Sequence, residues 1–265
     1  RLFGDIPTAV EQADDDREHE LDRTPRGVVR QALRRLVGVK FWPAVGDGSH
    51  AHDRREFWTL EVDGRQIWSS QCGEPLGVLD WCAGSGAWSS VIRALLAEAG
   101  VPVHITAVEL RACERGNIER WADEVLIGDQ SLALERGPFD LVIGNPAFSL
   151  FIPMLPRLLE VCTAAIILHT TETLQRTEAG ANLARALPPI RELGIPGSVR
   201  YRGAGTGADS RIYSVSAWVR NHRADSWPRE LLPLLPASER GWVEPPGAER
   251  VVLPCWPTAP GWSGA

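Results

Sequence analysis

One stretch decides the fold of this chain: Gly77-Val78-Leu79-Asp80-Trp81-Cys82-Ala83-Gly84-Ser85-Gly86. Its first half is apolar and of β type, and its second half is a glycine-rich loop that leads into a helical pattern at residues 87–99. A strand, a tight turn and a helix N-terminus form a site for a nucleotide-like ligand, because the glycines let the backbone approach closely and the helix end offers free N–H groups. The stretch therefore predicts an α/β fold built around this turn.

Strand and helix patterns alternate along the chain on the C-terminal side of this turn. Strands are predicted at residues 76–80, 103–108, 125–127, 139–143, 164–168 and 213–219, and helical patterns at residues 87–99, 111–121 and, broken by prolines, 150–161. Such βαβ alternation predicts a mainly parallel sheet with helices on both faces.

Three of the predicted strands are followed by a carboxylate. Asp80 ends the first strand and can accept hydrogen bonds from a cationic amino group. Glu109 ends the second strand, where a carboxylate can bind both hydroxyls of a ribose, and Asp129 follows the third strand and can accept from an adenine amino group. In a parallel sheet these ends meet at one edge, so the three carboxylates favour a nucleotide cofactor over an ordinary tight turn.

A second stretch pairs a buried strand with a polar loop: Phe139-Asp140-Leu141-Val142-Ile143-Gly144-Asn145-Pro146-Ala147-Phe148. An exocyclic amino group is a poor nucleophile, because its lone pair is delocalised into the ring. If Asn145 Oδ1 and the Pro146 carbonyl accept its two hydrogens, the nitrogen becomes more tetrahedral, and Phe148 can stack on the base plane. This loop is therefore suited to holding a planar amino group.

The two stretches resemble the motifs of a known enzyme family. The residues from Val78 to Gly86 resemble the first motif of class I S-adenosylmethionine-dependent methyltransferases, and Asn145-Pro146-Ala147-Phe148 resembles the (Asp/Asn)-Pro-Pro-(Tyr/Phe) loop of amino-nitrogen methyltransferases. The resemblance implies catalytic roles for Asn145, Pro146 and Phe148. It also implies cofactor contacts, with the residues concerned being Thr24, Pro25, Asp80, Ala83, Gly84, Gly86, Glu109, Asp129 and Asn145.

Two further segments extend this resemblance. Thr24-Pro25, where Thr24 is the expected N-cap of a helix and Pro25 its first residue, resembles the motif that covers the methionine end of the cofactor in adenine methyltransferases. The segment at residues 198–210 resembles small phage and prophage enzymes described as DNA adenine methyltransferase-like. The implied fold is a Rossmann-like, mainly parallel seven-stranded sheet with an antiparallel last strand. One departure is Ala147, which replaces the second proline and loosens the loop.

The expected activity is methyl transfer to an exocyclic amino nitrogen, with adenine N6 in flipped-out DNA as the first choice. Two alternatives remain open. One is a methyltransferase acting on an RNA base or a protein glutamine amide. The other is a cofactor-binding interaction protein without catalysis, which Ala147 and the net charge of −6 both allow.

Composition adds weaker expectations. The five cysteines are scattered and odd in number, which argues against a disulfide framework and favours a cytoplasmic location. No apolar run reaches the roughly 20 residues of a membrane span, so no membrane partner is expected. His50 and His52 lack a ligand cluster, so no metal is expected either.

The chain is expected to divide into three parts. Residues 1–21 form an acidic N-terminal segment, and residues 22–220 form the methyltransferase domain. Within that domain residues 39–75 are an insertion, where Asp63-Gly64 marks a two-residue β-hairpin. Residues 221–265 are a Pro- and Trp-rich tail that is either partly disordered or wrapped over the domain.

Overall fold

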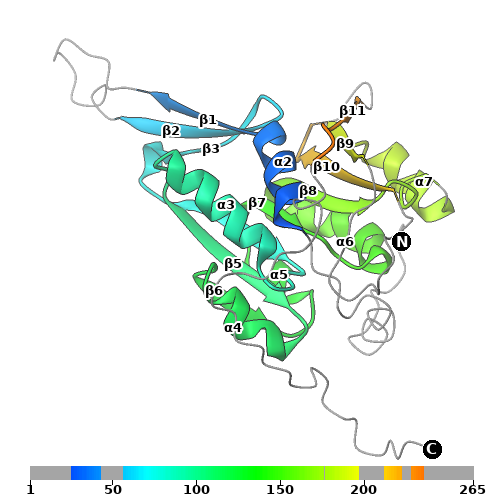
Figure 1. Cartoon of the computed structure of the whole chain (residues 1–265), viewed down its shortest axis with the longest axis horizontal. Helices are drawn as coiled ribbons and strands as arrows, with labels where there is room; N and C mark the ends of the chain where they lie inside the picture. The colour runs from blue at the N-terminus through cyan, green and yellow to red at the C-terminus, as the bar shows by residue number, and fades with distance from the viewer. Residues whose placement is uncertain (1–24, 43–55, 176, 197–211, 223–227, 236–265) are drawn as a thin grey trace, which may run out of the picture.

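The computed structural model describes residues 25–42, 56–175, 177–196, 212–222 and 228–235. Its main sheet has eight strands in the order β11-β9-β10-β8-β7-β4-β5-β6 (Figure 1). These strands are β4 (Leu76–Trp81), β5 (Val103–Glu109), β6 (Glu124–Ile127), β7 (Phe139–Gly144), β8 (Cys162–Thr170), β9 (Arg191–Ile195), β10 (Tyr213–Val219) and β11 (Arg229–Leu231).

The strand directions confirm the fold class. Strand β4 pairs in parallel with both β5 and β7, and the parallel pairing continues outward to β6 on one side and β8 on the other. Strand β10 lies antiparallel between β8 and β9. The sheet is therefore the mainly parallel sheet with an antiparallel late strand that was expected for a class I methyltransferase fold. Strand β11 pairs in parallel with β9 and adds an eighth strand at this edge of the sheet.

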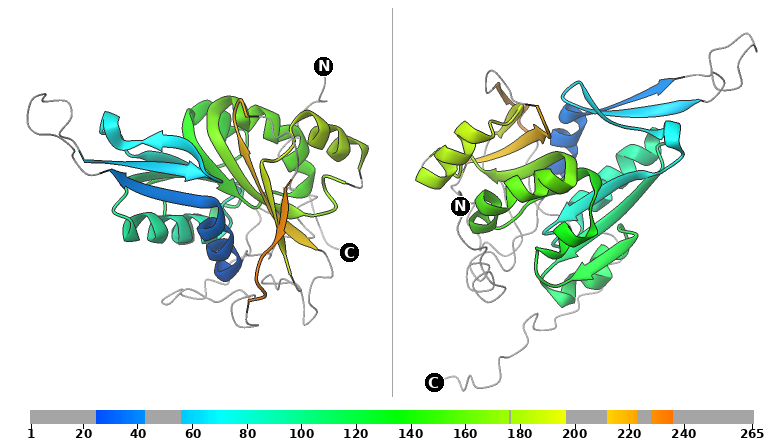
Figure 2. Two further views of the ribbon diagram at one scale, coloured as in Figure 1. Left: turned by 90° about the horizontal axis from the view of Figure 1, so that it is seen from above. Right: turned by 180° about the vertical axis from the view of Figure 1, so that it is seen from behind.

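Helices cover both faces of this sheet (Figure 2). They are α2 (Arg26–Leu36), α3 (Ala87–Glu98), α4 (Arg115–Ile118), α5 (Leu132–Arg136), α6 (Phe148–Val161) and α7 (Glu178–Ala186). The apolar side chains of α2 and α3 share one buried cluster with alternate residues of the strands. Those of α6 and α7 share a second cluster with the remaining residues of the same strands. The central strands of the sheet therefore lie between two apolar layers.

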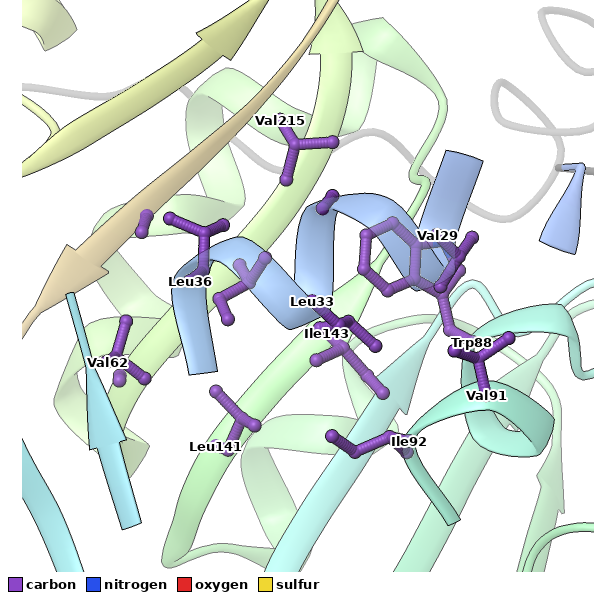
Figure 3. Packing of buried hydrophobic residues seen from close by; sticks show 14 of the residues in the cluster. Val29, Leu33, Leu36, Val62, Trp88, Val91, Ile92, Leu141, Ile143 and Val215 are labelled. Atoms are coloured by element: carbon purple, nitrogen blue, oxygen red, sulfur yellow. The ribbon is translucent and has the colours of Figure 1, made fainter. Parts of the chain in front are cut away.

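Helix α2 is held by its apolar face, which is buried in the core. Val29, Leu33 and Leu36 are buried against Trp88 of α3 and against Ile143 of β7 (Figure 3). Burying side chains of this size contributes roughly 1.5–3 kcal/mol each. The helix starts one residue later than predicted, because Pro25 is its N-cap and makes no side-chain capping bond. Thr24 lies outside the described residues.

The insertion forms a three-stranded antiparallel sheet of its own, with β1 (Val37–Trp42), β2 (Phe57–Val62) and β3 (Arg65–Ser69). The predicted hairpin joins β2 to β3, and both turn residues have positive φ, 47° at Asp63 and 77° at Gly64. This conformation is the one that Asp-Gly turns favour between twisted strands. Strand β1, which was not predicted, continues directly from α2 and projects from the body of the molecule (Figure 1).

Several elements differ from their prediction. Helix α6 runs unbroken through Pro153 and Pro156, and the helix expected at 111–121 is only a 3₁₀ turn (Ala112–Glu114) followed by α4. Helices α5 and α7 and strand β9 were missed, and β11 lies in the segment that was assigned to the tail. The cysteine prediction also needs correction, because Cys113 is disulfide-bonded, whereas Cys82 and Cys162 are free. No helix among the described residues is long and apolar enough to cross a membrane.

Candidate functional site

The two loops that the sequence singled out lie side by side at the carboxyl edge of the sheet. Trp81 and Gly144, the last residues of β4 and β7, are register partners. A Cβ atom on Gly144 would lie only 2.1 Å from the Trp81 carbonyl oxygen, so the two backbones are in direct contact. Asn145, the next residue, is therefore placed beside the turn that starts at Cys82.

The glycine-rich turn uses backbone conformations that side chains disfavour. Gly84 and Gly86 have φ values of 56° and 76°, and Cys82 shares this left-handed region with a φ of 59°. Gly86 is also the N-cap of α3, and a Cβ there would lie 3.2 Å from Trp121 Cδ1. Both the left-handed backbone conformation and the close Trp121 ring therefore favour glycine at position 86. The turn is anchored at Ala83, whose N–H donates to the Val108 carbonyl at 3.0 Å.

Asp80 lies behind the turn and is completely buried. Its Oδ2 accepts hydrogen bonds from the backbone N–H and the hydroxyl of Ser89, at 2.9 and 2.6 Å, whereas Oδ1 meets no donor and no solvent. Burial raises the pKa of Asp80 to about 7, against the opposing effect of the Ser89 bonds, and the Glu109 charge raises it slightly further. In this state Asp80 fixes the first turn of α3. Its predicted contact with a cationic amino group stays a prediction.

Glu109 forms the second wall of the turn and is 3% exposed. Its Oε2 accepts from the Gly84 N–H at 2.7 Å, and its Oε1 accepts from the backbone N–H and the Nε of Arg111, at 3.0 and 2.7 Å. The Arg111 guanidinium reaches back over the turn, since a Cβ on Gly84 would lie 3.6 Å from its Nη2. Sequence reasoning missed Arg111, because a single arginine after a strand carries no pattern.

Asp129 follows β6 at the same edge. Its Oδ1 accepts from the Ser131 N–H at 2.8 Å and so closes a local turn. Its predicted contact with an adenine amino group stays a prediction. The adjacent Gln130 is 4% exposed, and its Oε1 has no hydrogen-bond partner. Gln130 was also missed by sequence reasoning, and its burial is the only signal that marks it.

The loop at Asn145–Phe148, which the sequence predicts to be catalytic, connects β7 directly to α6. Pro146 is buried and Asn145 is partly buried. Ala147 is the N-cap of α6, with φ −55° and ψ 139°, and its carbonyl accepts from the Leu150 and Phe151 N–H groups. Phe148 is the first residue of α6, but its side chain lies outside what the structure describes. Its stacking on a base therefore stays a prediction.

The start of α2 also reaches this edge. The Arg26 guanidinium lies over the Trp121 ring, 5.1 Å from the ring centroid, and the same ring contacts Gly86. Pro25 is buried at this point. The structure thus brings Pro25 to the vicinity of the cofactor turn, as a role in covering the cofactor requires, although that role is untested.

A histidine at the same edge is unsuited to proton transfer. His169 of β8 is completely buried, and burial lowers its pKa to about 4. Its Nδ1 donates to the Thr170 carbonyl at 2.8 Å, so Nε2 is left to accept from the Ser216 hydroxyl at 2.9 Å. This neutral ring stacks on Phe151 and serves the packing of α6.

The described residues hold no group of three side chains suited to a metal ion. His50, His52 and the segment 198–210 lie outside the described residues. The donor set at the edge instead suits a nucleoside: Glu109 offers carboxylate oxygens beside the Gly84 backbone, Asp129 offers an acceptor, and the N-terminus of α3 offers N–H groups. The residues present fit the cofactor that the motifs imply.

Comparisons with known proteins give fold-level similarity only. No family model matches the chain, and no curated protein does. Among 117 matching chains of solved structures is a modification subunit of a putative type I restriction enzyme from Vibrio vulnificus YJ016, with 13% identity and a TM-score of 0.49 over 85% of this chain and 52% of that one. The EcoKI M protein matches with 11% identity and a TM-score of 0.48, over 76% of this chain and 44% of that one.

A putative class I S-adenosylmethionine-dependent methyltransferase from Listeria monocytogenes matches with 13% identity and a TM-score of 0.47. The alignment covers 60% of this chain and 58% of the Listeria protein. This chain thus spans between about two fifths and three fifths of these three structures. The fold assignment rests on the strand order and directions described above.

Proposed function

We propose that this chain transfers a methyl group from S-adenosylmethionine to an exocyclic amino nitrogen, with adenine N6 in DNA as the substrate. One observation carries the proposal: the backbone contact between Trp81 and Gly144 places Asn145-Pro146 beside the glycine-rich turn. An acceptor pair for an amino group thus stands next to a nucleoside site, which is the juxtaposition that this transfer needs.

The cofactor would be held by the residues that line the turn. Glu109 would accept from the ribose hydroxyls, Asp129 would accept from the adenine amino group, and N–H groups at the N-terminus of α3 would bind a carboxylate. When bound, S-adenosylmethionine supplies an electrophilic methyl group on a sulfonium. The Arg111 side chain must yield part of its contact with Glu109 for the ribose to enter.

The catalytic loop would act on the amino nitrogen. Asn145 Oδ1 and the Pro146 carbonyl accept its two hydrogens, which localises the lone pair on the nitrogen and directs it toward the methyl group. This stabilisation grows as the nitrogen becomes tetrahedral, so it lowers the barrier rather than only tightening ground-state binding. No strong base is needed before attack, because methylation itself makes the N–H acidic. The buried, neutral His169 is consistent with this chemistry.

The preference for adenine in DNA rests on the resemblance of Thr24-Pro25 and of residues 198–210 to adenine methyltransferases, whereas Asn145-Pro146-Ala147-Phe148 supports an amino nitrogen in general. The decisive experiment offers tritiated-methyl S-adenosylmethionine with DNA, RNA and protein pools, followed by nucleoside and peptide analysis. N6-methyladenine in DNA supports the proposal. Label in an RNA base or a glutamine amide moves the substrate to that class, and cofactor binding without any transfer favours the non-catalytic binding protein.

Asn145→Ala tests the role of the loop in the same assay. One acceptor is lost where it matters most, so we expect kcat to fall by about 100-fold or more, as for removing one preorganised hydrogen-bonding group from a transition state. Cofactor affinity, measured by calorimetry, should change far less than kcat, because the loss concerns mainly the transition state. Near-normal turnover in a folded variant would mean that Asn145 is only a turn residue.

A further inference from the structure

Three arginines lie along the outer face of α2. Arg26, Arg30 and Arg34 are spaced four residues apart, so their side chains share one side of the helix. The opposite side, with Val29 and Leu33, is buried in the core (Figure 3). Arg30 and Arg34 are exposed, and Arg26 is partly buried. We call these three residues the α2 arginine stripe.

The charges of the stripe are poorly compensated by the described part of the chain. Arg30 makes no hydrogen bond or ion pair there, and the acidic neighbour of Arg34 is Glu98, 3.8 Å away. Both of those side chains are at least 60% exposed, so the pair is weak. The pKa of Arg26 is lowered, first by burial and then by the positive charge of Arg30. Two cations thus stand close together on this face.

Arg35, the next arginine of α2, provides a comparison, because it forms an ion pair that joins two elements of the fold. Arg35 Nε and Nη2 donate to the two carboxylate oxygens of Glu230, at 2.9 and 2.7 Å. This bidentate pair joins α2 to β11 and commits two N–H donors of the Arg35 guanidinium to one carboxylate. Within the described residues, Arg30 and Arg34 make no bidentate ion pair of this kind, and both side chains are exposed.

The stripe begins at the candidate site. Arg26 lies over Trp121, and Trp121 contacts Gly86 in the cofactor turn. From there the three Cα positions span about 12 Å along the helix, at 1.5 Å per residue. A long polyanion whose reacting unit sits at the catalytic loop would therefore find further positive charge beside the site, even though the whole chain carries a net charge of −6.

We propose that the α2 arginine stripe binds the sugar-phosphate backbone of the nucleic acid that the site modifies. This inference rests on the proposed function, because it assumes a nucleic-acid substrate. Backbone phosphates match the stripe in charge, and contacts of this kind position a substrate without reading its sequence. Phosphate contacts from Arg30 and Arg34 would hold the strand while the target base is turned out.

The test compares the salt dependence of binding for the parent and for Arg30→Gln/Arg34→Gln. The probe is a short fluorescein-labelled DNA duplex, and anisotropy is measured between about 50 and about 200 mM NaCl. Each phosphate contact adds about 0.9 to the steepness of the fall of log K with log salt. The double variant loses two contacts, so its slope should be shallower than that of the parent by about 1.8. Cofactor affinity should be unchanged, since neither residue touches the cofactor turn.

A matched control removes two arginines that are already paired. Arg35→Gln/Arg136→Gln takes away the same charge from residues bound to Glu230 and Glu124. Its salt slope should stay close to that of the parent. An equal fall in both double variants would overturn the proposal, because it would show an effect of net charge alone.

Two other outcomes are also decisive. If Arg30→Gln/Arg34→Gln binds the duplex like the parent but melts at a lower temperature, the stripe contacts the chain's own acidic residues, and the proposal fails. Methyl transfer by the parent is measured on the same duplex with labelled cofactor. If the parent methylates DNA but Arg30→Gln/Arg34→Gln has the same salt slope as the parent, only the role of the stripe is refuted. If label is found in protein but in no nucleic acid, the proposed function itself is refuted.

Discussion

The cofactor turn and the catalytic loop leave neighbouring strands at the same height, yet they are held in different ways. In the turn, the Gly84 N–H is bound by Glu109 and the Ser89 N–H by Asp80, so carboxylates from two strands fix its backbone. The catalytic loop enters α6 at Ala147, which provides no side-chain cap. The turn is thus held by buried carboxyl groups, whereas the loop is placed by contact with the turn and by the packing of α6.

The largest effect should come from the point that joins the two regions. In Gly144→Ala the added methyl group would meet the Trp81 carbonyl at 2.1 Å, so β4 and β7 must separate. We expect a loss of about 5 kcal/mol in the free energy of unfolding, near the upper end for single substitutions. Urea denaturation measures it. The control is Gly116→Ala, where no atom lies within 4 Å of the new Cβ and stability should be maintained or slightly raised. Equal stability of the two variants would contradict the described contact.

The second effect isolates the buried carboxyl group of Asp80 behind the turn. The pKa of Asp80 is about 7 in the folded protein and 3.8 in the reference state, so the folded state retains a proton that the unfolded state loses. Stability from this group is present below pH 4 and is lost as the pH rises through 7. A shift of about three units corresponds to about 4 kcal/mol.

Asp80→Asn removes this titration while keeping the shape of the side chain. The free energy of unfolding of the parent should therefore fall by about 4 kcal/mol between pH 4 and pH 8 through this group, and that of the variant should not. Denaturant unfolding of both proteins at both pH values measures the difference. A parallel pH dependence of variant and parent would mean that Asp80 is ionised in the folded protein.

The third effect tests whether the turn is covered when the cofactor is absent. Arg111→Ala removes the guanidinium that competes for Glu109 Oε1, so we expect S-adenosylhomocysteine to bind more tightly by about 1 kcal/mol. The matched variant Glu109→Ala should weaken binding by roughly 1–3 kcal/mol. Both are measured by calorimetry. Weaker binding by Arg111→Ala would show that Arg111 itself contacts the ligand.

The smallest effect concerns the loop. Ala147 has φ −55°, which proline can adopt, and its N–H makes no hydrogen bond among the described residues. Ala147→Pro should raise stability by about 0.4–1 kcal/mol and leave methyl transfer equal or higher. Thermal melting and the tritium assay check this. A folded variant that loses both cofactor and activity would show that the loop needs a conformation that proline forbids.

The strands of the sheet were predictable wherever they are apolar throughout. Val78 to Asp80 and Leu141 to Ile143 are buried runs between turn signals, and their local pattern alone indicates a strand. Strand β9 begins with Arg191 and Glu192, so its sequence gives no such signal. Glu192 is nevertheless 2% exposed, and it accepts a hydrogen bond from Ser214 of the neighbouring strand. Only the assembled sheet makes this segment a strand.

Helix α6 shows the opposite error. Pro153 and Pro156 each remove a helical hydrogen bond, at a typical cost of about 3 kcal/mol, and this predicted a break. The helix continues because its apolar side bears Phe151, Met154, Leu155 and Leu158, all completely buried against the sheet. Tertiary packing therefore outweighs local propensity. Arg111 and Gln130 were missed for a related reason, since their importance lies in what surrounds them.

Strand β11 has a consequence for the order in which the molecule can assemble. Arg35 and Gln31 of α2 bond to Glu230 and to the Pro233 carbonyl, about 200 positions further along the chain. Contacts of such long range form late in folding. During synthesis α2 therefore lacks its contacts with Glu230 and Pro233 until this segment has left the ribosome. A protein shortened at residue 221 would keep every motif quoted above but leave the edge of β9 unpaired, which is a template for aggregation.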